Sequence, residues 1–478
     1  MGCALIWFRR DLRLTDHLAL DAARRAGLRP IPVYIHAPEE DGDWAPGAAS
    51  RVWLRRSLEA LSERLRGCGS ALVVRQGESL ATLRALIAET GAQAVYWHRL
   101  YEPAAIARDT RVKQALLADG IDAQSFNGAL IAEPWTVATG TDAPYRVFTP
   151  FWKNARQRLA DRGAPIPAPT SLPGIAPGLQ SVSLDALGLD PPPHQPRWDA
   201  GFWQHWRAGE AGAAELLDAF VDGAARGYKE QRNHPDRIGT SRLSPHLHFG
   251  EITPRQICAR LDSIAWPASV APDIDHFRSE LGWREFSHHL LYHFPDSVSE
   301  GLNPRFAGFD WAEPGPDLLA AWQRGRTGIP IVDAGMRELW ATGWMHNRVR
   351  MIVASVLTKN LRYHWLHGAR WFWDTLVDAD LANNTQGWQW TAGTGADAAP
   401  YFRVFNPALQ AARFDARGCY IRRWLPELAA LPTDALAAPW ERPELLKSKA
   451  PDYPSKPVVD LRASRERALA AYGRVSAG

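Results

Sequence analysis

Residues 51–75, RVWLRRSLEALSERLRGCGSALVVR, decide the fold class of the N-terminal part of the chain. Their first two thirds have apolar side chains at helical spacing, and they end in a short β-rich run, residues 71–75. Strands that alternate with helical segments favour a parallel sheet covered by helices on both faces. We therefore predict a doubly wound, Rossmann-like α/β domain over residues 1–130, with ligands beyond the carboxyl ends of its strands. The other β-rich runs are residues 4–8, 31–36, 94–98 and 121–126.

The remainder of the chain has a different character. Residues 161–200 contain nine prolines and no sustained periodicity, so we expect an interdomain linker over 131–200. From residue 201 onward, apolar residues recur at helical spacing and strand signals are scarce. This pattern predicts a large all-α domain over 201–478.

The composition excludes several classes of protein. The chain has 478 residues and a net charge of +3, a balance that permits a polyanionic partner without requiring one. No apolar run approaches the roughly 18 residues of a membrane span, and no cleavable secretory signal is evident, so we expect a cytoplasmic protein with no membrane partner. No GxGxxG motif or P-loop occurs in the first 130 residues. The cysteines are isolated, which argues against a disulfide scaffold or a cysteine-ligated cluster: Cys3, Cys68, Cys258 and Cys419.

A hydroxyl-rich segment follows Tyr228, in GTSRLSPHLHFGEI at residues 239–252. Ser244 before Pro245 is typical of a helix N-cap with proline at the first helical position. The N–H groups of such a helix start, beside neighbouring hydroxyls, can bind an anion such as a pyrophosphate. The alternative is a capped helix that binds nothing.

The segment FRSELGWREFSHHLL, residues 277–291, combines a carboxylate with an indole. Glu280, Trp283 and Arg284 are three and four positions apart and share one helical face. The carboxylate of Glu280 beside the indole of Trp283 suits recognition of a planar ring with an N–H or carbonyl edge. The alternative is a surface ion pair beside a core tryptophan. Three histidines here do not form a HExxH pattern, and we expect no metal: His288, His289 and His293.

Two arginines lie close together in GWMHNRVRMIVASVL, residues 343–357. Arg348 and Arg350 are two positions apart, so they cannot share one face of a helix. One of them is then available for a phosphate, and the other for an acid in the core.

Acids that suit the second arginine occur in DADLANNTQGWQW, residues 378–390. A buried carboxylate is costly unless it is paired, so pairing of Arg350 with Asp378 or Asp380 is the plainest interpretation. Asn384 in the same segment can donate or accept a hydrogen bond toward a heteroaromatic ring.

Tryptophan is unusually frequent, with 22 residues against 11 tyrosines. Because indole is easily oxidised by one electron, a relay of tryptophans from a buried acceptor to the surface would carry an electron hole. Trp311, Trp365 and Trp388 are candidates. The alternative for each is a core aromatic residue.

Together these motifs resemble the photolyase/cryptochrome family. Within it the chain is most similar to bacterial cyclobutane pyrimidine dimer (CPD) DNA photolyases, nearest to the class III branch that is close to plant cryptochromes. The resemblance covers nearly the whole chain. The matching segments are IWFRRDLRLTDH, YKEQRNHPDRIGTSRLSPHLHFGEI, ELGWREF, GIPIVDAGMRELWATGWMHNRVRM and DADLANNTQGWQWTAGTGADAAPYFRVFNP.

The resemblance implies an antenna-binding α/β domain followed by a helical domain that holds FAD and repairs DNA. It implies that a monomer acts on UV-damaged DNA: light drives an electron from excited FADH⁻ to a dimer flipped out of the duplex, the cyclobutane ring splits, and the electron returns. It further implies that Arg350 pairs with Asp378 and that Asn384 faces flavin N5. The implied FAD-binding positions are Tyr228, Thr240, Ser241, Leu243, Ser244, Arg284, Arg350, Asp378, Asp380 and Asn384.

The family's substrate pocket also transfers to this sequence by position. Glu280 would hydrogen-bond the dimer edge, and Trp283 and Trp390 would stack on it. The implied dimer- and DNA-binding positions are Glu280, Trp283, Asn347, Arg348, Met351 and Trp390, of which Glu280, Asn347 and Met351, together with Asn384, are the expected catalytic residues. Trp388, Trp365 and Trp311 match the photoreduction triad, although the spacing from Trp311 to Trp322 differs by one from the usual pattern.

The sequence departs from the family at the antenna. Folate-binding class I enzymes use a carboxylate after the Tyr-Glu pair, and Ala105 stands at that position in YEPAAIARD. By analogy with the nearest branch we expect 5,10-methenyltetrahydrofolate at the carboxyl ends of the sheet; the alternatives are a deazaflavin and the absence of an antenna chromophore. Arg51, which we expect to open a helix, is the candidate contact for either chromophore.

Three other functions compete with CPD repair. Plant-type cryptochromes, which are blue-light photoreceptors, tend to carry Asp opposite flavin N5, where Asn384 stands here, and the chain ends at Gly478 without a long signalling tail. A (6-4) photolyase requires a catalytic His at the position of Asn347. A Trp-rich sugar-binding or hydrolytic protein would need paired catalytic carboxylates without the flavin motifs.

Overall fold

The structure, a computed structural model, describes residues 2–159, 163–175, 178–397 and 402–476. These residues form two compact units that interleave along the chain. Each unit is made of several separate segments of the chain, so this division does not test the predicted domain boundaries at residues 130 and 200. Those boundaries stay a prediction. The α/β unit comprises Met1–Gly223, Ser241–Pro295 and Val377–Asp380, and the helical unit comprises Ala224–Thr240, Asp296–Leu376 and Leu381–Gly478.

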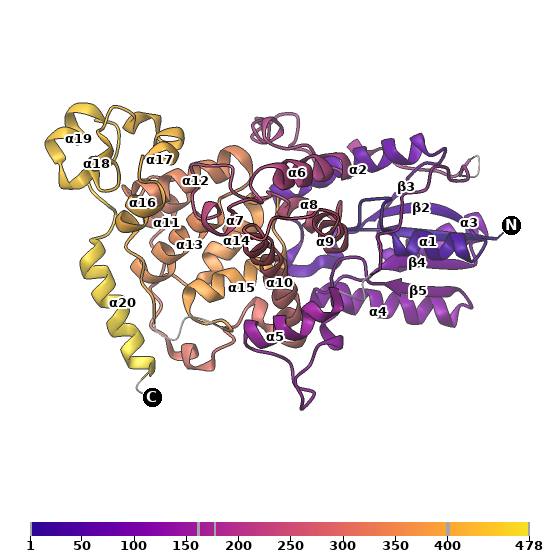
Figure 1. Ribbon diagram of the computed structural model, residues 1–478. Helices are drawn as coiled ribbons and strands as arrows, with labels where there is room; N and C mark the ends of the chain where they lie inside the picture. Colours follow the sequence, from indigo (N-terminus) through magenta and orange to yellow (C-terminus); the bar gives the residue numbers. More distant parts are fainter. Residues whose placement is uncertain (1, 160–162, 176–177, 398–401, 477–478) are drawn as a thin grey trace. The chain divides into compact units, whose positions relative to one another are not determined.

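The α/β unit contains a five-stranded parallel sheet with strand order β3-β2-β1-β4-β5 (Figure 1). All five predicted strands are present, with ends that differ from the prediction by at most two residues, and the predicted doubly wound α/β class is confirmed. All six residues of β1 are buried, as expected for a parallel sheet with helices on both faces. The strands are β1 Cys3–Phe8, β2 Arg29–His36, β3 Val73–Gln76, β4 Ala94–His98 and β5 Asp122–Phe126.

Helices cover the sheet from two sides. Helices α3 (Ser79–Thr90) and α4 (Pro103–Ala118) bury leucine and valine side chains in one core cluster with Leu5 and Trp7 of β1. Successive strand residues point to opposite faces, so this cluster lies on one side of the sheet. Helix α1 (Leu18–Arg25) contributes no residue to that cluster and packs against β1, β2, β4 and β5.

Helix α2 (Ala48–Gly67) begins earlier than the sequence suggested. Arg51 is its fourth residue and not its first, so the expectation that Arg51 opens this helix is wrong. Gly47 occupies the N-cap, and two alanines follow it. Alanine has the highest helix propensity, which lets the helix extend back to the glycine.

The segment expected as a linker has structure of its own. It contains helix α5 (Phe148–Ala155), with buried Phe148 and Phe151, and three 3-10 turns. Backbone hydrogen bonds attach its described residues to the α/β unit: the Leu172 N–H donates to the Cys68 carbonyl, the Val182 N–H donates to the Val74 carbonyl of β3, and the Ile166 carbonyl accepts the Asp16 N–H. The described residues of the proline-rich stretch are therefore fixed along the α/β unit. The three turns are Pro134–Thr136, Arg156–Leu159 and Leu184–Leu187.

The α/β unit also contains helices that follow this segment in sequence. They are α6 Glu210–Asp222, α8 Ser244–His248, α9 Pro254–Asp262 and α10 Ala271–His293.

In the helical unit every regular element of the described residues is a helix or a helical turn, which confirms the predicted all-α character. Proline begins several of these helices, at a position where its missing N–H costs nothing. The principal elements are α7 Tyr228–Gln231, α11 Pro316–Gln323, α12 Pro330–Thr342, α13 Asn347–Ser355, a π-helical turn Val356–Asn360, α14 Trp365–Thr375, α15 Leu381–Ala392, α16 Pro407–Phe414, α17 Cys419–Trp424, α18 Thr433–Leu436, α19 Pro443–Lys449 and α20 Leu461–Ser476. None of the described helices combines the length and the apolar character that crossing a bilayer requires.

Candidate functional site

A polar group fills the place where an open α/β sheet usually binds a ligand. The chain runs outward from β1 through β2 to β3 and then returns to β4, so the switch point lies between β1 and β4. Asp11, His17 and His98 are buried there. The Asp11 Oδ2 atom lies 2.8 Å from Nδ1 of His98 and 3.2 Å from Nε2 of His17. By proximity alone these three side chains could hold a metal ion, and they are the only such group of three in the described part of the chain.

The hydrogen bonds of the two imidazoles do not fit a metal. His17 Nδ1 accepts the Leu20 N–H at 3.1 Å, and His98 Nε2 accepts the Ala19 N–H at 3.4 Å. The nitrogens that face Asp11 must therefore carry the protons, and they have no lone pair for a metal. Burial lowers the pKa of His98 to about 3. Burial alone would raise the pKa of Asp11, but the hydrogen bonds from His17 and His98 outweigh it and hold that pKa well below its ordinary value.

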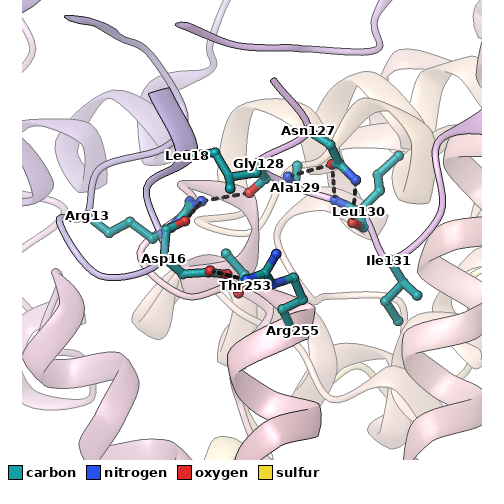
Figure 2. Close-up of a pocket in the computed structure, with 10 residues that line it drawn as sticks. All are labelled: Arg13, Asp16, Leu18, Asn127, Gly128, Ala129, Leu130, Ile131, Thr253 and Arg255. Carbon is teal, nitrogen blue, oxygen red and sulfur yellow. Dashed lines mark hydrogen bonds and ion pairs between the residues drawn. The ribbon is translucent and has the colours of Figure 1, made fainter. Parts of the chain in front are cut away.

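A small cavity lies at the same edge of the sheet, between the loops that follow β1 and β5 and the start of α9 (Figure 2). Asp16 accepts hydrogen bonds from Arg255 and Thr253, both at 2.9 Å, and Arg13 donates to the Gly128 carbonyl at 2.9 Å. Its volume of about 220 Å³ is below the roughly 300–1,000 Å³ of ordinary ligand pockets. A whole folate or deazaflavin therefore does not fit in it.

The loop that lines this cavity is clamped by α10. The buried carboxylate of Glu285 accepts the N–H groups of Ile131 and Ala132 at 2.8 and 3.1 Å, and Arg284 donates to the Ala129 carbonyl at 2.8 Å. Burial raises the pKa of Glu285 to about 6. Arg284, an expected FAD contact, is thus oriented by the same loop, and sequence reasoning did not identify Glu285 as its neighbour.

The dimer-binding residues expected on α10 include one with a stacking partner. Trp283 is half-buried, and its ring lies parallel to Phe148 of α5, with centroids 3.7 Å apart and planes 9° apart. A Cβ at Gly282 would come within 2.6 Å of the Trp152 ring, so glycine allows α5 and α10 to approach closely. Glu280 is also half-buried and lies 3.7 Å from Nε2 of His276. Phe148 was not identified from the sequence, because it lies far from Trp283 along the chain.

Asp378 and Asp380, the expected FAD-contacting acids, are both buried. The Asp380 carboxylate lies 3.5 Å from Nε2 of His288 and 3.8 Å from Nδ1 of His248. Burial would raise the pKa of Asp380, but the charge of His288 and the proximity of both histidines hold it well below the ordinary value. An ionised, buried carboxylate of this kind is a strong acceptor for an N–H or O–H of a cofactor.

The hydroxyl-rich segment differs from its prediction at one residue. Ser244 is the first residue of α8 and not its N-cap, so that prediction is wrong. Leu243 is the N-cap and already has near-helical angles, φ −80° and ψ −2°, so the helical turn starts one residue early. Ser244 is exposed, while Ser241 and Thr240 are half-buried. Tyr228 is buried at the start of α7.

Helix α13 carries four expected site residues. Asn347 is exposed at its first turn, and Met351 is half-buried. Arg348 donates to the Asn233 side chain and lies over the Phe414 ring at 4.4 Å. Arg350 donates to the Met345 carbonyl at 2.7 Å. Because Asp378 belongs to the α/β unit, the pairing of Arg350 with Asp378 stays a prediction.

Helix α15 packs against both α13 and α14 and carries Asn384, Trp388 and Trp390. The buried Asn384 amide donates to the Ala369 carbonyl of α14 at 2.9 Å, and its Oδ1 accepts no hydrogen bond from the described residues. The buried Trp388 ring contacts Phe372 at 5.0 Å. Trp390 is half-buried.

The three candidate electron-transfer tryptophans have different neighbours. The Trp388 ring also meets the Trp322 ring edge to face, at 6.2 Å. The fully buried Trp365 and the half-buried Trp311 each contact His364, at 5.6 and 5.1 Å. His364 therefore lies between Trp365 and Trp311, a position that the tryptophan pattern alone could not show.

Comparisons with known proteins match photolyases and cryptochromes over nearly the whole chain. Residues 4–170 match a family model described as DNA photolyase, and residues 277–474 match the FAD binding domain of DNA photolyase. The deoxyribodipyrimidine photo-lyase of Agrobacterium fabrum is 46% identical over 98% of each chain. Cryptochrome-1 of Arabidopsis thaliana is 37% identical over 98% of this chain and 69% of its own length. The crystal structure of a bacterial class III photolyase from Agrobacterium tumefaciens has a TM-score of 0.94 and 45% identity, over 100% of this chain and 98% of its own.

Replacing Gly368 with alanine should destabilise the protein and displace the Trp388 ring. Gly368 lies inside α14, and a Cβ there would overlap the six-membered part of that ring. Overpacking costs about 1–3 kcal/mol, which exceeds the roughly 1 kcal/mol by which alanine is favoured over glycine in a helix. We expect a lower midpoint of thermal unfolding and a shifted indole fluorescence emission.

Gly387→Ala is the matched control for that substitution. Gly387 lies inside α15 on an exposed surface, where a Cβ would meet nothing within 4 Å. This change should raise the free energy of unfolding by about 1 kcal/mol. An equal gain in Gly368→Ala would show that close approach of α14 does not hold Trp388.

Proposed function

The chain belongs to the photolyase/cryptochrome family, and we propose from that membership that it is a light-driven lyase that repairs cyclobutane pyrimidine dimers in UV-damaged DNA with FAD. The observation that carries the proposal is the 46% identity to a deoxyribodipyrimidine photo-lyase over 98% of both chains. We further propose that it acts in the cytoplasm as a monomer.

The residues on each unit suit FAD. Asp380 offers an ionised, buried carboxylate, and Arg284 offers a guanidinium oriented by the Ala129 carbonyl. Asn384 keeps its carbonyl oxygen available while its amide is held by α14, so it can accept an N–H at the position expected for flavin N5. When bound and reduced, FAD supplies the light-driven electron that the reaction requires. The chain's own residues bind it and fix its orientation.

The dimer is proposed to leave the duplex and to lie against the indoles of the site, since damage lowers the cost of flipping. Phe148 backs Trp283 with a parallel ring and so fixes the indole plane that receives a base. Stacking of this kind is worth about 1–3 kcal/mol per base. Glu280 would hydrogen-bond the dimer edge, and Asn347 and Met351 are further proposed dimer-binding residues.

A basic cluster on the helical unit suits the DNA backbone. Burial lowers the pKa of Arg348, and the charges of Arg232, Arg413 and Arg403 lower it further. Guanidinium groups that repel one another favour an anion among them, here a phosphate. Affinity for DNA should therefore fall as the salt concentration rises.

A photoreceptor function of the cryptochrome type is the second candidate. It is favoured by the identity of 37–39% to plant cryptochromes and by the TM-score of 0.87 to a cryptochrome from Synechocystis, which is 30% identical over 98% of this chain. Repair activity separates the two functions.

The deciding experiment is repair of an oligonucleotide that contains one CPD. The purified protein with FAD, reduced chemically beforehand, is illuminated with blue light, and a dark sample is the control. We expect light-dependent loss of the dimer and release of free flavin on denaturation. A folded protein that binds FAD but leaves the dimer intact would support the photoreceptor function, and one that cannot bind FAD would refute both.

Trp388→Phe should slow photoreduction of the oxidised flavin while sparing repair by pre-reduced enzyme. The electron route to the flavin is needed only to reduce oxidised flavin, and Trp388 is assigned to that route. Flavin absorbance during illumination measures the first process, and the CPD assay measures the second. Equal loss of both activities would assign Trp388 to packing, in agreement with its contact to Phe372.

Glu280→Ala should lower the repair yield more than the affinity for damaged DNA. One hydrogen bond to a charged group is worth about 1.5–3 kcal/mol. Much of this stabilisation would act only after the dimer has accepted the extra electron. Interactions that are stronger in the transition state than in the ground state are the ones that raise a rate. Unchanged yield with weaker binding would make Glu280 a binding residue only.

We propose methenyltetrahydrofolate as the antenna, at the carboxyl edge of the sheet. Arg51 is exposed on α2, where its guanidinium donates to the Pro46 carbonyl at 3.1 Å, so it can turn to a chromophore at little cost. Arg51→Ala should remove an absorbance band beyond that of the flavin while FAD is retained. Extraction of a deazaflavin would refute the folate, and a band that persists in the variant would exclude Arg51.

A further inference from the structure

Lys359 is a buried cation that has no carboxylate partner among the described residues. It lies in the π-helical turn Val356–Asn360, and its side chain is only 1% exposed. Its ammonium donates to the carbonyl of Ala392 at 2.5 Å and lies 3.2 Å from the centroid of the Phe402 ring. Burial lowers the pKa of Lys359 well below its ordinary value. Burying such a group is costly, so these two contacts must offset much of the loss of water.

The first contact fixes the end of α15. Ala392 is the last residue of that helix, and the final carbonyls of a helix lack intrahelical partners and carry its negative end. Lys359 satisfies one of them with a charged donor. The same turn is held from another direction by Gln389, whose amide donates to the carbonyls of Ser297 and Glu300 at 2.7 and 2.8 Å. Trp388 lies one turn before Ala392 and is fixed with it.

The second contact belongs to an aromatic group that includes Trp311. We define the exit cluster as Phe306, Phe309, Trp311, Phe402 and Tyr472, which pack together in the helical unit. Phe402 stacks on Tyr472 of α20 at 4.6 Å, and Phe309 contacts Trp311 at 4.5 Å. The ammonium of Lys359 thus joins the end of the helix that carries Trp388 to the cluster that contains Trp311. Cation–π attraction of this kind is stronger in a desolvated site.

We propose that Lys359 is a positioning residue for the electron-transfer route: it holds the C-terminal turn of α15, and with it Trp388, against the exit cluster. The inference rests on the proposed function, in which Trp388 and Trp311 carry electrons to the flavin. Lys359 itself touches neither of these two rings in any contact described here, and it acts through Ala392 and Phe402.

The test compares Lys359→Met with Thr358→Val in the full-length protein. Methionine keeps an apolar stem of similar length but removes the donor and the charge. Thr358 is buried in the same π-helical turn, and its hydroxyl donates only to the Ala354 carbonyl, at 2.8 Å, so valine removes a local bond without touching α15. Amide hydrogen exchange over residues 388–395 reports on the helix end with or without FAD. The yield of photoreduction from oxidised flavin reports on the route.

We expect Lys359→Met to speed amide exchange over residues 388–395 and to lower the photoreduction yield several-fold relative to Thr358→Val. Each variant is measured at the same number of degrees below its own unfolding midpoint. Repair by chemically reduced enzyme should be retained in Thr358→Val, and in Lys359→Met it should fall less than the photoreduction yield, because Trp390 lies in the same turn. Equal exchange and equal yield in the two variants would overturn the inference and leave Lys359 a structural residue only.

Three further outcomes have defined meanings. If Lys359→Met does not fold, Lys359→Gln replaces it with the same expectation. The glutamine side chain is one bond shorter than that of lysine, so its amide cannot reach the Ala392 carbonyl in the same geometry. A photoreduction yield equal to that of Thr358→Val would then overturn the inference. Wild-type photoreduction that does not depend on Trp388 would also overturn it. By contrast, Trp388-dependent photoreduction in a protein that repairs no dimer would refute only the proposed function.

Discussion

The carboxyl edge of the sheet depends on how the buried carboxylate of Asp11 is held. An isolated ion in a protein interior costs several kcal/mol. Here His17, His98 and the backbone N–H of Arg9 all donate to it. These donors come from the loop after β1, the residue before α1 and the end of β4, so one charge fixes three elements at the switch point. A sheet of this kind ordinarily binds a ligand at its switch point, and here the buried side chains of Asp11, His17 and His98 occupy that point.

The same requirement shapes the rest of the molecule. Asp333 in α12 accepts hydrogen bonds from the backbone and hydroxyl of Thr327, from the Gly328 N–H and from the Tyr453 hydroxyl. Glu285 likewise ties a loop to α10 through two backbone N–H groups. Each buried acid therefore joins segments that are distant in sequence, and its removal would leave several unsatisfied donors.

The sequence predicted what is local and missed what is not. Parallel strands buried on both faces appear as short apolar runs, so all five were found within two residues of their ends. Helix starts were displaced at Arg51 and Ser244, because a cap is worth only about 1 kcal/mol and neighbouring residues can extend a helix past it. The site residues were named from a family resemblance, and their partners were not. Phe148 behind Trp283 comes from another segment, and Trp311 meets His364, the N-cap of the helix that Trp365 begins, from a distant part of the chain. Spacing along one helix contains no information about either contact.

Lys359 differs from the buried acids in how completely it is satisfied. Asp333 has four donors, whereas the ammonium of Lys359 has one carbonyl and one ring. The contacts of the Trp388 ring with Phe372 and Trp322 are aromatic and weakly directional, while hydrogen bonds fix direction. The orientation of that indole is set by the close approach of α14 at Gly368 and by the backbone of the last turn of α15, which Gln389 and Lys359 hold from two sides. Burial of a cation with so few partners lowers the stability of the protein, but its hydrogen bond fixes the end of α15. That helix carries Asn384, Trp388 and Trp390.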